Sequence, residues 1–287
     1  MDWERQRENW PNSDLSRFVS AAGVRWHVQQ AGTQGPRVLL LHGTGASLHT
    51  WRDFLNPLAE HAPVLAIDLP GHGFSSLAAA EGMSLPGMAR GITQLLDELA
   101  WPVQAFIGHS AGAAIAAQMV LDTPLQPEVL IGINPAWLPL PGLAGLLFPP
   151  AAKLLAMTPA VPHWFARQAS RPGVLEKLLQ STGSVLDARG NDLYAQLVAS
   201  PAHAQGALNM MAAWDLSRGR EKLRQLRCPV RLLVGGKDAT VPPVQAKQAM
   251  ELLHNGELTE WPAYGHLVHE EAPTETLLYW RKQLSLE

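Results

Sequence analysis

A serine between two glycines, at a predicted strand-to-helix junction, is the feature that most constrains this chain of 287 residues. An apolar run over 102–107 leads into Gly-His-Ser-Ala-Gly at 108–112, and small residues follow. This pattern predicts a strand, a sharp turn and a helix, with Ser110 at the apex of the turn. Glycines two positions before and after the serine leave room for that turn. The hydroxyl then lies beside a helix N-terminus, where free N–H groups favour developing negative charge.

Asp238 and His266 follow the serine in the order that a catalytic triad on such a turn requires. A serine nucleophile needs a base to take its proton and an acid to orient that base. Asp238 ends a β-rich run at 230–238, and His266 comes shortly after a strand-like run at 257–261. Both therefore follow predicted strands, where α/β sheets place their chemistry. We predict that Ser110, Asp238 and His266 form the triad.

A glycine-rich loop after the predicted strand at 37–42 completes the expected site. Acyl transfer requires two N–H donors for the oxyanion, one after the nucleophile and one from the loop after an early strand. We predict that the backbone N–H groups of Ala111 and Thr44 are these donors. The resulting mechanism requires no cofactor.

The chain resembles the α/β-hydrolase superfamily over nearly its whole length. Besides the serine turn and the glycine-rich loop, three segments are similar to that superfamily's loop after the fourth strand, its acid loop and its histidine loop: 67–75, 238–243 and 265–273. The resemblance implies an α/β-hydrolase fold, which has a mostly parallel central sheet, helices on both faces and an inserted helical cap. It also implies ester hydrolysis or a related acyl transfer.

A narrower resemblance is to the magnesium-chelatase accessory proteins of bacteriochlorophyll synthesis. It is carried by segments in and outside the catalytic loops: 1–5, 42–47, 108–116, 181–184, 186–190 and 211–216. This resemblance implies a role in magnesium–tetrapyrrole metabolism and an association with magnesium chelatase. The ligand is then a small apolar ester or a tetrapyrrole intermediate. Two alternatives stay open, namely a non-catalytic tetrapyrrole carrier and a lyase that uses the same triad.

Strand and helix patterns alternate up to residue 133 and again from residue 229, after a predicted hairpin at 17–31. This alternation predicts a parallel sheet with helices on both faces. Between the two blocks, only helix-compatible apolar segments appear, separated by proline and glycine. We therefore predict a hydrolase core in two parts, 1–135 and 227–287, and a helical cap at 136–226 that overhangs the catalytic loops.

Large apolar side chains of the predicted cap are candidates for the lining of a substrate pocket. With His109, the candidates are Trp137, Trp164, Met210, Met211 and Trp214. Packing of the cap on the core is the alternative for at least half of them, and the same two readings apply to Phe148 and Phe165. His163 and His203 could be axial ligands to a macrocycle magnesium, or could simply form hydrogen bonds.

Other polar residues receive structural interpretations. Asp68 precedes the nucleophile, so we expect it to shape its loop. Asn134 stands where some relatives of this fold place an acid, and its neutral amide favours Asp238. Several histidines lack metal-ligand spacing, so we expect no metal site at His42, His72, His109 or His269.

Composition fits a reducing compartment and argues against nucleic acid as a partner. The net charge of −3 gives no basis for nucleic-acid binding. The single cysteine, Cys228, and the absence of a visible secretory signal indicate a cytoplasmic protein. Prolines interrupt the longest uncharged stretch, from Val129 up to the residue before Lys153, so we expect no transmembrane segment. Contact of a surface helix with a membrane stays open.

Overall fold

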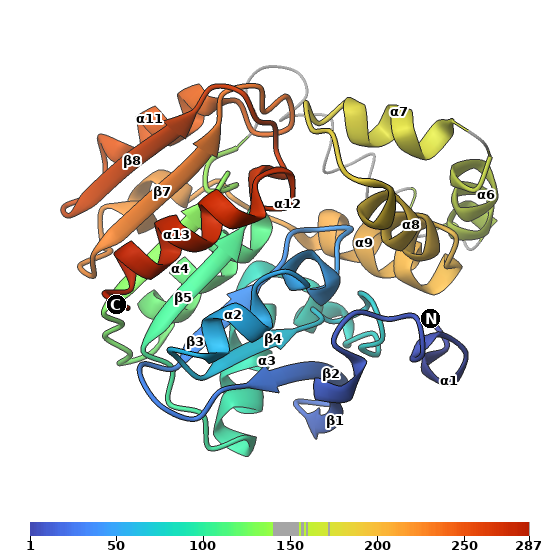
Figure 1. Cartoon of the computed structure of the whole chain (residues 1–287), viewed down its shortest axis with the longest axis horizontal. Helices are drawn as coiled ribbons and strands as arrows, with labels where there is room; N and C mark the ends of the chain where they lie inside the picture. The colour runs from blue at the N-terminus through green and yellow to red at the C-terminus, as the bar shows by residue number, and fades with distance from the viewer. Residues whose placement is uncertain (140–154, 156–157, 159, 172, 287) are drawn as a thin grey trace.

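An eight-stranded sheet forms the centre of the molecule in a computed structural model that describes residues 1–139, 155, 158, 160–171 and 173–286 (Figure 1). The strand order is β1-β2-β4-β3-β5-β6-β7-β8. Pairing is antiparallel between β1 and β2 and between β2 and β4, and parallel elsewhere. The strands are β1 (Ser16–Ala21), β2 (Val24–Ala31), β3 (Val38–Leu41), β4 (Val64–Ile67), β5 (Ala105–His109), β6 (Val129–Ile133), β7 (Val230–Gly235) and β8 (Gly256–Trp261).

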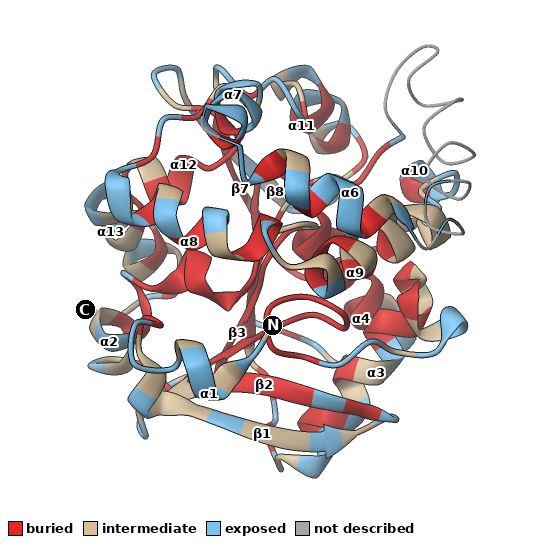
Figure 2. Ribbon diagram, turned by 90° about the vertical axis from the view of Figure 1, so that its right-hand side faces the viewer, coloured by how far each residue is buried: buried red, intermediate tan, exposed pale blue. Residues whose placement is uncertain are grey.

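Burial of the strands follows their place in the sheet (Figure 2). Every residue of β3, β4, β5 and β6 is buried, as expected for parallel strands that helices cover on both faces. The edge strands β1 and β8 contain no buried residue. The predicted α/β architecture with a mostly parallel sheet is therefore confirmed.

Two layers of helices cover the sheet. Residues of three helices pack in one apolar core on the first face: α3 (Leu85–Glu98), α4 (Ala111–Asp122) and α11 (Pro243–Met250). On the second face the core includes residues of the 3-10 helix η2 (Leu48–Trp51), α2 (Leu55–Ala59) and α13 (Pro273–Gln283). Short helices also occur: α1 (Trp3–Gln6), η1 (Ser13–Leu15), η3 (Ala80–Met83) and α12 (Val268–Glu271).

The described residues between β6 and β7 form a helical insert, and none of them is in a strand. Its helices are α6 (Ala160–Ala169), α7 (Val174–Gln180), α8 (Ala188–Val198), α9 (Pro201–Ala213) and α10 (Gly219–Leu223). In Figure 1, α6, α7, α8 and α9 lie together beside the sheet. A third apolar cluster lies beneath α7 and α8 and includes Trp10 and Phe74. The first helix-compatible segment of the predicted cap, 143–157, lies almost entirely outside the described residues.

The helical region after β3 is divided in two. The sequence pattern at 50–60 predicts one helix, but η2 and α2 are separate. Pro57 explains the break, because it lacks the N–H that would bond to residue 53 within a continuous helix.

Cys228 is buried, and burial raises the pKa of its thiol, as expected for an unreactive structural residue. Among the described helices, none is long and apolar enough to cross a membrane.

Candidate active site

Ser110 occupies the strained turn between β5 and α4. Its backbone has φ 52° and ψ −116°, a conformation that costs energy for any residue with a side chain. A Cβ atom at Gly108 would lie 2.5 Å from the backbone nitrogen of Ala113. A Cβ atom at Gly112 would lie 2.1 Å from the carbonyl oxygen of Leu41. The steric reason predicted for both glycines is therefore confirmed.

Asp238 and His266 form a buried hydrogen-bonded pair. Asp238 follows β7 and His266 follows β8, and the distance from His266 Nδ1 to Asp238 Oδ2 is 2.7 Å. The other oxygen, Oδ1, accepts the backbone N–H groups of Thr240 and Val241, both at 2.8 Å. One carboxylate oxygen thus fixes the acid loop while the other holds the imidazole. This arrangement leaves His266 Nε2 available for proton transfer.

His109 connects the histidine loop to the serine turn. Its Nε2–H donates to the carbonyl oxygen of His266 at 2.9 Å, and the two ring centroids are 4.7 Å apart. His109 directly precedes Ser110, so His266 lies close to the turn. Within the described part of the chain, the Ser110 hydroxyl forms no hydrogen bond. Such contacts are often long before substrate binds, and the assignment of the triad stays a prediction.

The two backbone segments predicted to hold the oxyanion both adjoin Ser110. Ala111 is the first residue of α4, and the Ser110 side chain does not cap that helix, so the Ala111 N–H has no acceptor within the helix. A Cβ atom at Gly43 would lie 3.1 Å from the Cβ of Ser110, so the glycine-rich loop passes directly against the turn. Thr44 follows Gly43, and its hydroxyl donates to Met210 Sδ at 3.3 Å.

Asn134 ties the acid loop to the histidine loop from the end of β6. Its side-chain Nδ2 donates to the carbonyl oxygens of Gly265 and His266, at 3.1 and 2.7 Å. Its Oδ1 accepts the Gly235 N–H at 2.9 Å. The side chain is buried, and every one of these bonds is to backbone. The residue is a scaffold for the two loops, a role that its sequence position alone did not reveal.

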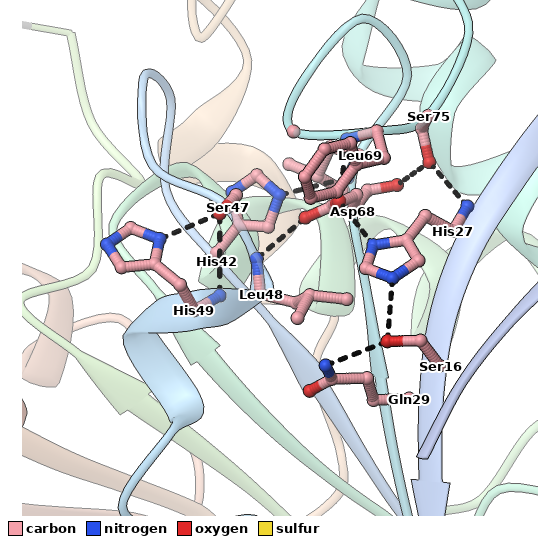
Figure 3. A network of polar contacts seen from close by, with 12 residues as sticks. Ser16, His27, Gln29, His42, Ser47, Leu48, His49, Asp68, Leu69 and Ser75 are labelled. Carbon is pink, nitrogen blue, oxygen red and sulfur yellow. Dashed lines mark hydrogen bonds and ion pairs between the residues drawn. The ribbon is translucent and has the colours of Figure 1, made fainter. Parts of the chain in front are cut away.

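Asp68 shapes the loop after β4, as predicted (Figure 3). It is fully buried and accepts the backbone N–H groups of Leu48 and Phe74, at 2.7 and 2.9 Å. Its Oδ2 also lies 2.7 Å from His27 Nδ1. Burial raises the pKa of Asp68, but these hydrogen bonds and the nearby histidines outweigh burial, so the net pKa is below the ordinary value.

Most histidines near the site are buried and neutral. Burial is the main cause that lowers the pKa of each of His42, His72, His109, His203 and His269. His203, on α9, uses both ring nitrogens: Nδ1 accepts the Gly73 N–H at 3.1 Å, and Nε2 lies 3.0 Å from the Gly45 carbonyl oxygen. The hydrogen-bonding interpretation of His203 is therefore confirmed, and its proposed role as an axial ligand is wrong in this conformation. His163 is exposed on α6.

His203 gives a pH-dependence prediction. Burial lowers the pKa of folded His203 from 6.5 to about 4, so only the unfolded chain takes up a proton between these values. The stability of the folded state therefore falls as pH drops below 6.5, by on the order of 3 kcal/mol for this side chain at pH 4. Urea titrations at pH 7.5 and 5 measure the free energy of unfolding at each pH. The decrease in this free energy from pH 7.5 to pH 5 should be smaller in His203→Gln than in wild type. Equal decreases in the two proteins would contradict the assignment.

The predicted pocket residues are dispersed. Met210 is fully buried and contacts Thr44. Trp137 is buried and lines a small pocket between α4 and α10, and Ser110 is not among the residues that line this pocket. Met211 and Trp214 are half-buried at the end of α9, whereas Trp164 is 61% exposed on α6. Phe148 lies outside the described residues. The structure therefore places Trp164 on the surface, apart from the buried group.

A buried charged cluster next to the histidine loop was missed by sequence reasoning. Glu270, on α12, accepts hydrogen bonds from Thr50 at 2.6 Å and Tyr194 at 2.9 Å, and pairs with Arg52. Burial raises the pKa of Glu270, although Arg52 opposes the shift. The cluster joins η2, α8 and α12, which are far apart in sequence. The acidic pair 270–271, set among apolar residues, was the only available signal.

Comparisons with known proteins agree with this geometry. Residues 38–277 match the profile of the alpha/beta hydrolase family. A protein named magnesium-chelatase 30 kDa subunit, from Rhodobacter capsulatus, is 38% identical over 95% of this chain and 95% of its own. The solved structure of an alpha/beta hydrolase fold protein from Burkholderia ambifaria covers 94% of this chain and 98% of its own, with TM-score 0.78 and 23% identity. An esterase from Exiguobacterium antarcticum covers 94% and 100%, with TM-score 0.77 and 19% identity. At these identities, the two structures support the fold alone.

Proposed function

The chain belongs to the alpha/beta hydrolase family, and from that premise we propose that it is a serine hydrolase that cleaves an ester-type bond. The observation that carries this proposal is the 2.7 Å hydrogen bond between His266 and Asp238, beside the strained serine turn. A buried Asp–His pair next to a serine at a helix N-terminus is the arrangement that activates a hydroxyl for attack.

In the proposed mechanism, His266 Nε2 takes the proton of the Ser110 hydroxyl while the Ser110 oxygen attacks the carbonyl carbon of the ester. Asp238 keeps the Nδ1–H tautomer and stabilises the imidazolium that forms. The N–H groups of Ala111 and Thr44 hold the oxyanion. His266 then gives its proton to the leaving alcohol, and an acyl-enzyme forms. Water attacks this ester with His266 as base, and the acid is released together with free Ser110.

The helical insert is the proposed cap, and the site beneath it is the proposed substrate site. Two contacts support this placement: the Thr44 hydroxyl meets Met210 on α9, and His203 bonds to Gly45 in the glycine-rich loop. The relative from Rhodobacter capsulatus bears the name of a magnesium-chelatase subunit. We therefore propose that the substrate is a magnesium–tetrapyrrole intermediate or a small apolar ester. We also propose that the protein acts in the cytoplasm and that magnesium chelatase is its partner.

Covalent labelling of the wild-type protein by a fluorophosphonate probe tests the hydrolase proposal. Labelling at Ser110, together with turnover of a small chromogenic ester, would support it, because both need an activated serine. A folded wild-type protein that neither labels nor turns over esters would overturn it. In that case, the non-catalytic carrier becomes the better reading. Activity on a substrate without probe labelling would favour the lyase, since that chemistry uses the base without an acyl-enzyme.

Titration with a magnesium porphyrin tests the tetrapyrrole part of the proposal. We expect saturable quenching of tryptophan fluorescence, because a planar macrocycle stacks on aromatic side chains. Trp214→Ala should weaken binding by about 1–3 kcal/mol. The exposed Trp164 on α6 offers a matched control, and Trp164→Ala should leave the affinity unchanged. Absence of saturable quenching, with good turnover of a small ester, would leave a general esterase.

A further inference from the structure

A short segment of the helical insert contacts both loops of the Asp–His pair. This segment, Thr182–Ser184, lies between α7 and α8. The carbonyl oxygen of Thr182 accepts the N–H of His266 at 3.3 Å and the N–H of Ala239 at 3.2 Å. Ala239 directly follows Asp238. One carbonyl group therefore bridges the backbone of the catalytic histidine and the backbone next to the acid.

The next residues of the segment hold the rest of the histidine loop. The buried Ser184 hydroxyl accepts the Leu267 N–H at 2.8 Å. Glu271 accepts the Gly265 N–H at 2.8 Å and, with its other oxygen, the N–H of Val185 at 3.1 Å. Three consecutive amides, at 265, 266 and 267, thus bond to the insert or to a carboxylate that also binds it. Asn134 holds two carbonyl groups of the same loop from the β6 side.

Glycine at 183 permits this close contact. Gly183 has φ +82°, and a Cβ atom there would lie 1.9 Å from the carbonyl oxygen of Lys237 in the acid loop. A Cβ atom at Gly265 would lie 2.3 Å from the carbonyl carbon of Gly183. Any side chain at either position would push the insert away from the catalytic loops. The pairing of these glycines explains why the segment 181–184, singled out in the sequence, contains one.

We propose that Thr182–Ser184 is a positioning clamp for the catalytic pair, so that the insert is part of the catalytic centre and not only its cover. Asp238 and His266 lie on separate loops after the paired strands β7 and β8. Beyond the ends of these strands, the contacts from Asn134 and from Thr182–Ser184 help to set the relative positions of the two residues. Displacements of about 1 Å cost large factors in rate, so these shared hydrogen bonds matter for proton transfer. The inference rests on the proposed serine hydrolase function.

Ser184→Ala tests the clamp, with Ser181→Ala as its matched control. Ser181 directly precedes the segment, but its hydroxyl is exposed and bonds only to the Leu178 carbonyl. In Ser184→Ala the Leu267 N–H loses its acceptor. We expect fluorophosphonate labelling to slow by about tenfold to a hundredfold, with a changed pH profile of the labelling rate. Ser184→Thr keeps a hydroxyl acceptor, so its labelling rate should be much closer to that of wild type. The labelling rate of Ser181→Ala should equal that of wild type.

A readout without turnover separates failure of the clamp from failure of the proposed function. The proton between His266 Nδ1 and Asp238 should give a downfield NMR signal in wild type, and hydrogen exchange can be measured at the amides of His266 and Leu267. We expect Ser184→Ala to shift or broaden that signal and to speed exchange at both amides. If folded Ser184→Ala keeps the signal, the exchange rates and the labelling rate of wild type, the clamp is refuted. If wild type does not label but Ser184→Ala still disturbs the signal, only the hydrolase proposal fails.

Discussion

Ser110→Ala should abolish fluorophosphonate labelling and lower kcat for ester turnover by about 10⁴- to 10⁶-fold. The variant lacks the attacking oxygen, while the N–H groups beside the turn stay in place. Alanine meets the same backbone strain at φ 52° as serine does, so the melting temperature should change little. Mass spectrometry of the labelled protein and steady-state kinetics provide the measurements. Labelling of the variant at the wild-type rate would show that the nucleophile is a different residue.

Asp238→Asn should lower kcat by about 10⁴-fold in a folded protein. The Asp238 Oδ1 accepts two backbone N–H groups, from Thr240 and Val241. An asparagine must therefore keep its oxygen at that position and turn its NH₂ group toward His266. The NH₂ group is a donor, so His266 Nδ1 has to accept and the proton moves to Nε2. The imidazole then cannot take the proton of Ser110, and ester kinetics at neutral pH should report the loss.

Asp68→Asn is the matched control, since it makes the same change at the other buried aspartate of these loops. The two Asp68 oxygens each accept one backbone N–H group, and Oδ2 also bonds to His27. In the variant, the side-chain NH₂ group that replaces one of these oxygens must face a backbone N–H donor. We expect a loss of about 3 kcal/mol in unfolding free energy, with near-normal kcat in the folded fraction. Because the pKa of Asp68 is lowered on folding, its contribution to stability is present above about pH 4 and is lost as pH falls further. If Asp68→Asn is fully stable but inactive, and Asp238→Asn is active, then Asp68 is the catalytic acid and Asp238 the structural carboxylate.

Local sequence rules were sufficient wherever one short segment determines its own structure. The glycines at 108 and 112 identified the serine turn because the strain at that turn depends on residues within two positions of Ser110. Runs of buried apolar residues identified the central strands for a similar reason, since parallel strands covered on both faces need apolar side chains at every position.

Contacts between distant segments were not predictable in the same way. Asn134 was judged only by its charge, yet its side chain joins backbone groups from Gly235 and Gly265. Arg52 and Glu270 are 218 positions apart, and neither residue type indicates its partner. The aromatic residues of the insert were grouped by composition, and the structure separates the exposed Trp164 from the buried Met210.

The sequence by itself determined the fold class, the serine turn and the order of the acid and histidine loops. Each of these depends on steric and hydrophobic rules that act over a few residues. Only the tertiary structure decided that Asp238 and His266 share a hydrogen bond, that Asn134 supports them from β6, and that Thr182–Ser184 contacts them from the insert. These contacts depend on how the sheet brings its loops together at one end. Apart from the bond between the Asp238 and His266 side chains, they involve backbone N–H and carbonyl groups, which carry no residue-specific signal.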